Sequence, residues 1–164
     1  MHDLSLYLLD ILENSVRAGA TVIATTIVAG GATDELVIRV EDDGPGLPVE
    51  AEQALDPFFT TKANKKTGLG LSLFRQAAEA AGGGLAVGRS DDLGGACVTA
   101  RMGLAHVDRP PLGDVAASVA TMVVTNPEIE FRVDLTDDVS HTALSGPDIP
   151  QRLGVLTAFQ EAHQ

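Results

Sequence analysis

The sequence predicts an α+β domain followed by a smaller C-terminal segment. Some stretches place apolar residues at helical spacing, and others are rich in β-branched residues or alternate apolar with polar. Helical stretches are separated by paired strand-like stretches, which favours the α+β class. The length of 164 residues is typical of about one domain.

Capping and turn residues mark the ends of the N-terminal helix and of the strands after it. Asp3 is placed to cap a helix that begins at Leu4, and Gly19 is placed to end it. Residues 21–28 and 35–41 then read as two strands joined by a glycine-containing turn, so we expect a hairpin.

The periodicity stops over residues 42–67, which carry turn residues, charges and two adjacent phenylalanines. A stretch of this length without clear structure inside a domain is usually functional. A helix is predicted next over residues 69–81, followed by strands over 85–89 and 96–102.

Composition changes at Arg109-Pro110-Pro111, so we divide the chain into a domain of residues 1–104 and an extension of residues 105–164. The role of the extension is not evident from its residues. Its expected elements are a helix over 112–124, a strand over 130–135, a polar loop, and a helix over 150–162.

The charge balance is strongly acidic: 11 lysines and arginines face 23 aspartates and glutamates, for a net charge of -12. Affinity for nucleic acid or for an anionic membrane surface comes mainly from cations, so neither partner is expected. The three lysines, Lys62, Lys65 and Lys66, fall within five residues. The extension holds 3 basic and 9 acidic residues and carries half of the net charge.

The single cysteine, Cys97, excludes an internal disulfide and is expected to be a small buried hydrophobe. No apolar run approaches the ~20 residues that span a bilayer. The first residues lack a basic leader, so a secretory signal is not expected. The sequence therefore predicts a reduced, cytoplasmic protein.

The first helix carries a polar stripe. Asp10 and Asn14 are four residues apart and share a face, and Arg17 lies three residues further on. A carboxylate, a carboxamide and a guanidinium in this arrangement can hold a metal ion and a phosphate. Alone, such a stripe is more often the solvated face of an amphipathic helix.

Three further motifs follow in order. Residues 42–46, Asp-Asp-Gly-Pro-Gly, form a tight turn after a strand, where an Asp can accept a hydrogen bond from an amine. Residues 56–62, Asp-Pro-Phe-Phe-Thr-Thr-Lys, combine two aromatics with a cation. Residues 67–72 place glycines at a helix start, where free N–H groups favour anions.

Together the motifs resemble the GHKL ATPase superfamily, which includes gyrase, heat-shock chaperone, histidine kinase and mismatch-repair ATPases. LLDILENSVRAGAT is similar to the N box, EDDGPGLP to the G1 box, DPFFTTK to the F box and TGLGLSL to the G2 box. The F and G2 boxes most resemble those of bacterial sensor histidine kinases. The resemblance spans about residues 3–103 and implies a Bergerat-type α/β sandwich: a mixed, mainly antiparallel sheet with helices on one face.

The resemblance implies ATP and Mg²⁺ as ligands. It implies that Asn14 binds the Mg²⁺ that bridges the phosphates and that Asp42 binds the adenine amine. It also implies that Arg17 lies near the phosphates. Gly44 and Gly46 give the base room. The contacts that it implies in the lid and the G2 box are Thr61, Lys62, Gly68, Leu69 and Gly70.

The sequence departs from the family pattern at three points. Relatives that hydrolyse ATP carry a Glu as general base where this chain has Asp10, and Lys66 stands where the G2 box usually has one more glycine. Histidine kinases carry a phospho-accepting histidine on a dimerising helical hairpin before the N box, and no such hairpin is expected here. The four histidines, His2, His106, His141 and His163, are scattered, and His106 and His141 are expected at the surface.

Three hypotheses remain open. The chain is a stand-alone module that phosphorylates or regulates a separate partner, such as a response regulator, an anti-sigma system or another phosphoacceptor. Alternatively, it is a nucleotide-gated binding module without turnover, or a slow ATPase with Asp10 as base. The extension could cap the sheet, form a homodimer or bind a partner.

Overall fold

The computed structural model describes residues 3–46 and 65–164, with the backbone alone for residues 65–69. Helix α1 spans Leu4–Arg17. The Asp3 carboxylate accepts a hydrogen bond from the Leu6 amide at 3.2 Å, as predicted for a capping residue. Gly19 has φ +90°, the left-handed conformation that ends a helix.

All the strands that the structure describes join one sheet in the order β3-β4-β2-β1-β5-β6. Its neighbouring strands are antiparallel, except that β1 and β5 run parallel. The sheet is therefore mixed and mainly antiparallel, as predicted. The strands are β1 Val22–Gly30, β2 Glu35–Asp42, β3 Gly84–Arg89, β4 Ala96–Gly103, β5 Glu130–Asp137 and β6 His141–Ser145.

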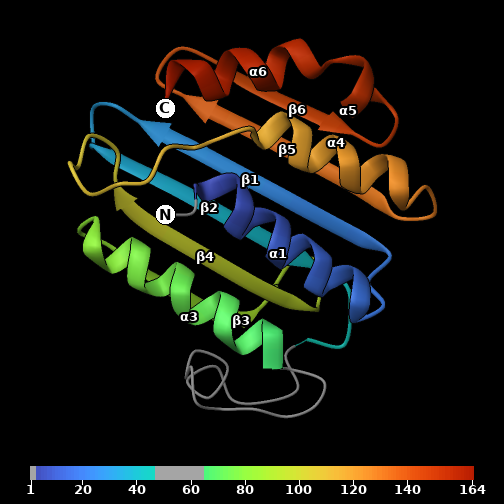
Figure 1. Cartoon of the computed structure of the whole chain (residues 1–164). Coiled ribbons are helices and arrows are strands. Elements are labelled where there is room, and N and C mark those ends of the chain that lie inside the picture. Colours follow the sequence, from blue (N-terminus) through green and yellow to red (C-terminus); the bar gives the residue numbers. More distant parts are fainter. Residues whose placement is uncertain (1–2, 47–64) are drawn as a thin grey trace.

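The helices lie over one face of this sheet, and the other face carries none in the described part of the chain (Figure 1). Helix α1 packs between α3 and α4, and α6 packs against α4. The α+β class and its one-sided layering are thus confirmed. Besides α1, the helices are α3 Lys65–Ala80, α4 Val115–Thr125, α5 Asp148–Gln151 and α6 Leu153–Ala162.

Several boundaries differ from the sequence prediction, and the helix predicted over 112–124 is observed as α4, Val115–Thr125. Helix α3 begins at Lys65, four residues before the predicted start. The predicted polar loop contains β6, and the helix predicted over 150–162 is divided into the short helix α5, which starts at Asp148, and α6. Strand β6 lies at the sheet edge and buries only Leu144 among its side chains, so its apolar signal is too weak to be recognised from sequence.

One hydrophobic core joins the predicted domain and the predicted extension. Leu8 of α1 and Ile27 of β1 belong to the same buried cluster as Val119 of α4, Phe131 of β5 and Phe159 of α6. The pairing of β5 along β1 covers what would otherwise be an open edge of the N-terminal sheet. The boundary at residues 104 and 105 therefore marks a change in composition inside a shared core.

Hydrogen bonds also fasten the extension to the start of α1. The amides of Leu4 and Ser5 donate to the carbonyls of Pro111 and Leu112, both at 2.9 Å. These bonds satisfy N–H groups that the first turn of a helix leaves without partners. The guanidinium of Arg109 donates to four carbonyls, which belong to Leu104, Pro110, His163 and Gln164.

The structure contradicts the expectation for Cys97 and confirms the expectation for two histidines. Cys97 is only partly buried, on the helix-free face of the sheet, so its expected burial in the core is wrong. His106 and His141 are exposed, as expected. No helix in the described ranges is long and apolar enough to cross a membrane.

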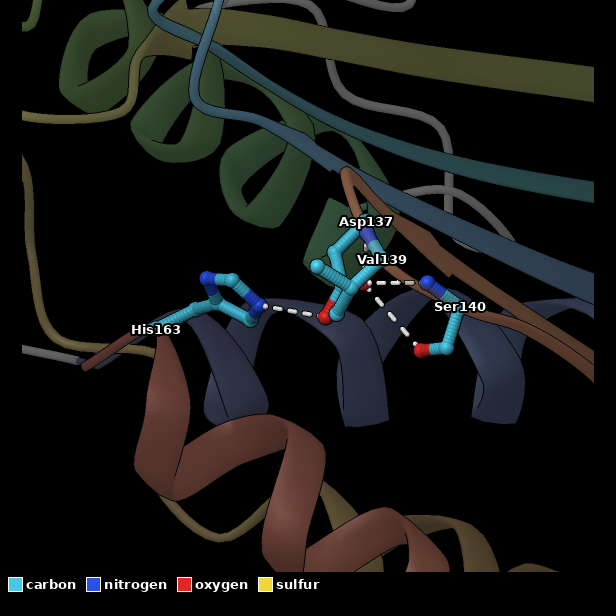
Figure 2. A network of polar contacts seen from close by, with 4 residues as sticks. All are labelled: Asp137, Val139, Ser140 and His163. Carbon is cyan, nitrogen blue, oxygen red and sulfur yellow. Dashed lines mark hydrogen bonds and ion pairs between the residues drawn. The ribbon is translucent and has the colours of Figure 1, made fainter.

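A half-buried ion pair ties the end of α6 to the end of β5. His163 Nε2 lies 3.1 Å from Asp137 Oδ2, and the two side chains are 17% and 13% exposed. The other carboxylate oxygen accepts hydrogen bonds from the amides of Val139 and Ser140 and from the Ser140 hydroxyl (Figure 2). These donors, His163 first, lower the pKa of Asp137 from 3.8 to about 2.

Asp137 should therefore give the fold acid sensitivity. Because its folded pKa is depressed, ionised Asp137 stabilises the fold above its ordinary pKa, and this stabilisation is lost as the pH falls toward about 2. After allowance for solvent screening, we expect the free energy of unfolding to fall by about 1 kcal/mol more in the wild type than in Asp137→Asn between about pH 5 and pH 2. Urea denaturation at several pH values measures this difference.

The matched control is Asp138→Asn, which removes the neighbouring exposed carboxylate. Asp138 makes no hydrogen bond or ion pair with any residue that the structure describes. The control should retain the acid dependence of the wild type. Equal acid dependence in Asp137→Asn and the wild type would contradict the role given to Asp137.

Candidate functional site

The centre of the site is the carboxylate of Asp42, at the end of β2. Asp42 is only 3% exposed. Its Oδ2 accepts a hydrogen bond from the Ser15 hydroxyl of α1 at 2.6 Å, and its Oδ1 accepts from the amides of Gly44 and Ala96, both at 3.0 Å. Three donors from different parts of the chain thus stabilise a buried charge that would otherwise be costly.

The turn between β3 and β4 closes over this carboxylate. The Gly95 amide donates to the Asp42 carbonyl at 2.9 Å. A Cβ added at Gly95 would lie 2.3 Å from Asp42 Oδ1 and 2.6 Å from the Gly44 nitrogen, so no larger residue fits without a backbone shift. On the same turn, the Ser90 hydroxyl donates to Glu41 at 2.6 Å.

Asp43 fastens the other side of the same turn. Its carboxylate accepts hydrogen bonds from the amides of Thr21 and Val22, at 2.7 and 2.9 Å, and from the Thr21 hydroxyl. These bonds lower the pKa of Asp43, with the Thr21 hydroxyl as the first cause. The two adjacent aspartates therefore have different partners: Asp42 binds α1 and β4, and Asp43 binds the start of β1.

The predicted polar stripe of α1 lies beside the G2 segment of α3. The Arg17 guanidinium donates to the Asn14 side-chain oxygen, which brings these two residues together as predicted. A Cβ at Gly70 would lie 3.4 Å from Asp10 Oδ2, so the Asp10 carboxylate borders α3 where that helix has no side chain. The motif residues Asp10 and Gly70 thus meet at the junction of two helices, and Asn14 lies one turn further along α1.

An aromatic stack fixes the relative position of these helices. The rings of Tyr7 and Phe74 are 5.0 Å apart and nearly parallel. Tyr7 precedes Asp10 by one helical turn and Phe74 follows Gly70 by about one turn, so the helices run in opposite directions here. Burial, and secondarily the charge of Asp10, raise the pKa of Tyr7.

The glycines of the G1 segment meet two different requirements. A Cβ at Gly44 would lie 3.3 Å from Asp42 Oδ1, so Gly44 permits close approach to the carboxylate. Gly46 has φ +84°, a conformation that favours glycine. A Cβ at Gly46 would lie 3.6 Å from the guanidinium of Arg89, which also donates to the Gly94 carbonyl at 2.7 Å.

Part of the predicted site lies outside the described residues. Thr61 and Lys62 belong to this part, and Gly68 and Leu69 are described only as backbone in the first turns of α3. Because the first four N–H groups of a helix lack partners within it, the early start of α3 at Lys65 places these groups before Leu69 and Gly70. The nucleotide roles of these residues remain predictions.

The donors around Asn14 fit a hard cation. Its side-chain oxygen and the nearby Asp10 carboxylate are ligands of the type that Mg²⁺ accepts. Among the described residues no group of three or more His, Cys, Asp or Glu side chains could hold a metal ion. The described residues thus form no all-protein cage there, and their few oxygen donors fit Mg²⁺ of the kind that also binds phosphate.

Residues 2–106 match the family described as histidine kinase-, DNA gyrase B- and HSP90-like ATPase. The chain belongs to this family. Its N and G1 segments are those that surround Asp42, and the family match ends close to the predicted boundary of the extension. A histidine kinase-like ATP-binding domain therefore forms the first two-thirds of the chain.

Curated relatives of this ATPase domain include two sensor proteins. The sensor protein CitS of Halalkalibacterium halodurans is 37% identical over 65 residues, which are 39% of this chain and 12% of that protein. The sensor protein kinase PilS of Pseudomonas aeruginosa is 36% identical over 84 residues, which are 48% of this chain and 16% of that protein. The match thus spans less than a fifth of each relative.

Among solved structures, the ATP-binding domain of PrrB from Mycobacterium tuberculosis is similar to this chain. The two share 27% sequence identity with a TM-score of 0.44, and the match covers 60% of this chain and 66% of that domain.

Sequence reasoning missed several residues of this ATPase site. Ser15 follows Asn14 directly, but its role depends on a contact with Asp42, which is distant in sequence. Gly95 lies between two predicted strands, and Ala96 is predicted only as the first residue of the second one. The adjacent glycines at residues 94–95 were the available signal, because such pairs mark close backbone approach.

Gly95→Ala should disrupt the site through sterics alone. The added methyl group would overlap the Asp42 carboxylate and its carbonyl, so we expect the free energy of unfolding to fall by about 2 kcal/mol. Gly88→Ala is the matched control, because no atom lies within 4 Å of its added Cβ. Chemical denaturation should place the control within about 0.5 kcal/mol of the wild type. Equal stability of the two variants would show that the turn does not close on Asp42.

Proposed function

We propose that this chain binds ATP with Mg²⁺ and uses the bound nucleotide to phosphorylate or regulate a separate protein in bacterial signalling. The observation that carries the proposal is the buried Asp42 carboxylate, held by Ser15, Gly44 and Ala96 inside a histidine kinase-like ATPase domain. The sensor proteins among its relatives support a role in signalling.

The hydrogen-bond count at Asp42 favours an amine ligand. A carboxylate offers about four acceptor positions, two on each oxygen. The amides of Gly44 and Ala96 take those of Oδ1, whereas Ser15 takes only one position on Oδ2. The remaining position on Oδ2 suits the exocyclic amine of adenine, and Gly44 and Gly46 leave room beside it.

The phosphate end of the nucleotide is proposed to lie over α1. Asn14 would hold Mg²⁺ through its side-chain oxygen, and Arg17, already in contact with Asn14, supplies a cation nearby. Bound Mg²⁺ would offset the phosphate charge. The proposed contacts from the second half of the site are Thr61, Lys62, Gly68, Leu69 and Gly70.

Asp42→Asn tests the nucleotide site. An amide of the same shape places an NH₂ group where the carboxylate has an oxygen, so Ser15 and adenine lose a common acceptor. We expect the affinity for ATP to fall about 100-fold in isothermal titration, as for the loss of a buried charged hydrogen bond. Asp43→Asn, one residue along, should keep the affinity within about threefold. A folded wild type that binds no ATP would overturn the proposal.

The fate of the γ-phosphate separates phosphotransfer from gating. The protein is incubated with Mg²⁺ and γ-labelled ATP, alone and with cell extract. Label on a second protein supports phosphotransfer. ATP binding that yields neither ADP nor labelled protein would contradict it and favour the nucleotide-gated module without turnover.

A slow ATPase is the second candidate, favoured by the position of Asp10 beside Gly70. Asp10 is one methylene shorter than the Glu of hydrolysing relatives, so as a base it would act through a shifted backbone or an intervening water. Asp10→Asn should abolish ADP release while ATP affinity stays within about threefold. Glu13→Gln is the control, because Glu13 is adjacent to Asn14 and points about 100° away from it around the helix, so ADP release should stay unchanged. Unaltered ADP release in Asp10→Asn would remove this candidate.

A further inference from the structure

The helix-free face of the sheet carries a hollow that the nucleotide site does not use. The hollow has a volume of about 860 Å³ and lies over β1, β5 and β6. Side chains alternate between the faces of a strand, so Ala24, Thr26, Ala143 and Ser145 belong to the face opposite the core. These side chains are small, and two of them, Thr26 and Ser145, carry a hydroxyl group.

The walls of the hollow are strongly acidic. Arg132 is the basic side chain among the described residues that line it. That guanidinium is already paired with Glu130 at 2.6 Å, so it does not neutralise the remaining wall. The acidic side chains that line the hollow are Glu41, Asp92, Glu128, Glu130, Asp134 and Asp148.

Three of these carboxylates lack a partner within the described chain. Asp134 pairs with His141 at 2.8 Å and Glu41 accepts from Ser90, whereas Asp92, Glu128 and Asp148 make no side-chain hydrogen bond or ion pair there. They come from three separate elements: the turn between β3 and β4, the loop before β5, and α5. All three side chains are exposed. Their negative charge is therefore available to an opposite charge from outside.

We propose that this hollow docks a basic segment of a partner protein. A Lys- or Arg-containing strand of polypeptide fits because its backbone can lie over the small side chains of the hollow while its long side chains reach the carboxylates at the rim. Charge complementarity of this kind sets specificity and association rate. This inference shares one requirement with the proposed function, namely that the chain acts on a separate protein, and it rests on the proposed function to that extent.

The docking face and the nucleotide site lie on opposite sides of one strand. Glu41 lines the hollow, and the next residue, Asp42, is the buried carboxylate on the helix side. The turn between β3 and β4 serves both faces, because Asp92 lines the hollow and Gly95 bonds to Asp42. A partner in the hollow would thus leave the nucleotide side of the sheet open.

The test compares two triple variants of the full chain that change the net charge equally. The hollow variant is Asp92→Asn with Glu128→Gln and Asp148→Asn. The control variant is Asp108→Asn with Asp138→Asn and Glu161→Gln, which removes three exposed carboxylates outside the hollow. The probe is a fluorescent peptide of alternating lysine and alanine, followed by anisotropy at about 0.15 M salt.

We expect the hollow variant to bind the peptide about tenfold more weakly than the wild type, and the control variant to stay within about twofold. If both variants bound the peptide equally more weakly, net charge alone would explain the effect and the proposal would be overturned. A wild type that does not bind the peptide would also overturn it. A wild-type dimer that the hollow variant dissociates, seen by sedimentation, would make a second copy the occupant and also overturn it. ATP titration of each protein keeps this result separate from that of the proposed function.

Discussion

The buried charge of Asp42 is the constraint around which the N-terminal half of the structure is arranged. A carboxylate with 3% exposure is tolerable only if hydrogen-bond donors replace the water that it has lost. Those donors come from α1, from the G1 turn and from the start of β4, so the three segments must keep their relative positions. The site is therefore preorganised by the same bonds that stabilise the junction of helix and sheet.

Much of the fold could be predicted because local signals are strong where side chains alternate or recur on one face. The cap at Asp3, the stop at Gly19 and the strands β1 and β2 follow from such signals. Strand β6 could not be predicted, since it sits at an edge and buries a single side chain. Cys97 was misplaced because an apolar run does not reveal which face of the sheet each residue occupies.

The residues of the candidate site also fall into those that local sequence signals indicate and those that only the structure reveals. The spacing and neighbours of Asp10, Asn14, Arg17 and Asp42 resemble the motifs of a known family, so these residues could be named as candidates, and their ligand roles stay predictions. Ser15, Gly95 and Ala96 could not, because their contribution depends on contacts with Asp42 from positions distant in sequence. Two residues provide only a backbone amide, and the sequence carries no side-chain chemistry that would mark them.

The parallel pairing of β1 with β5 has a consequence for the order in which the chain folds. Residues 22–29 pair with residues 130–137, and most of the protein lies between them. Contacts of such large sequence separation form slowly, because the entropy of closing a long loop is lost before the pairing stabilises anything. During synthesis, the unpaired backbone N–H and C=O groups along this edge of β1 must therefore wait until the last third of the chain has emerged. Until β5 pairs with it, β1 is an edge strand, although it lies in the middle of the finished sheet. The newly made chain is therefore most exposed to aggregation before β5 has emerged.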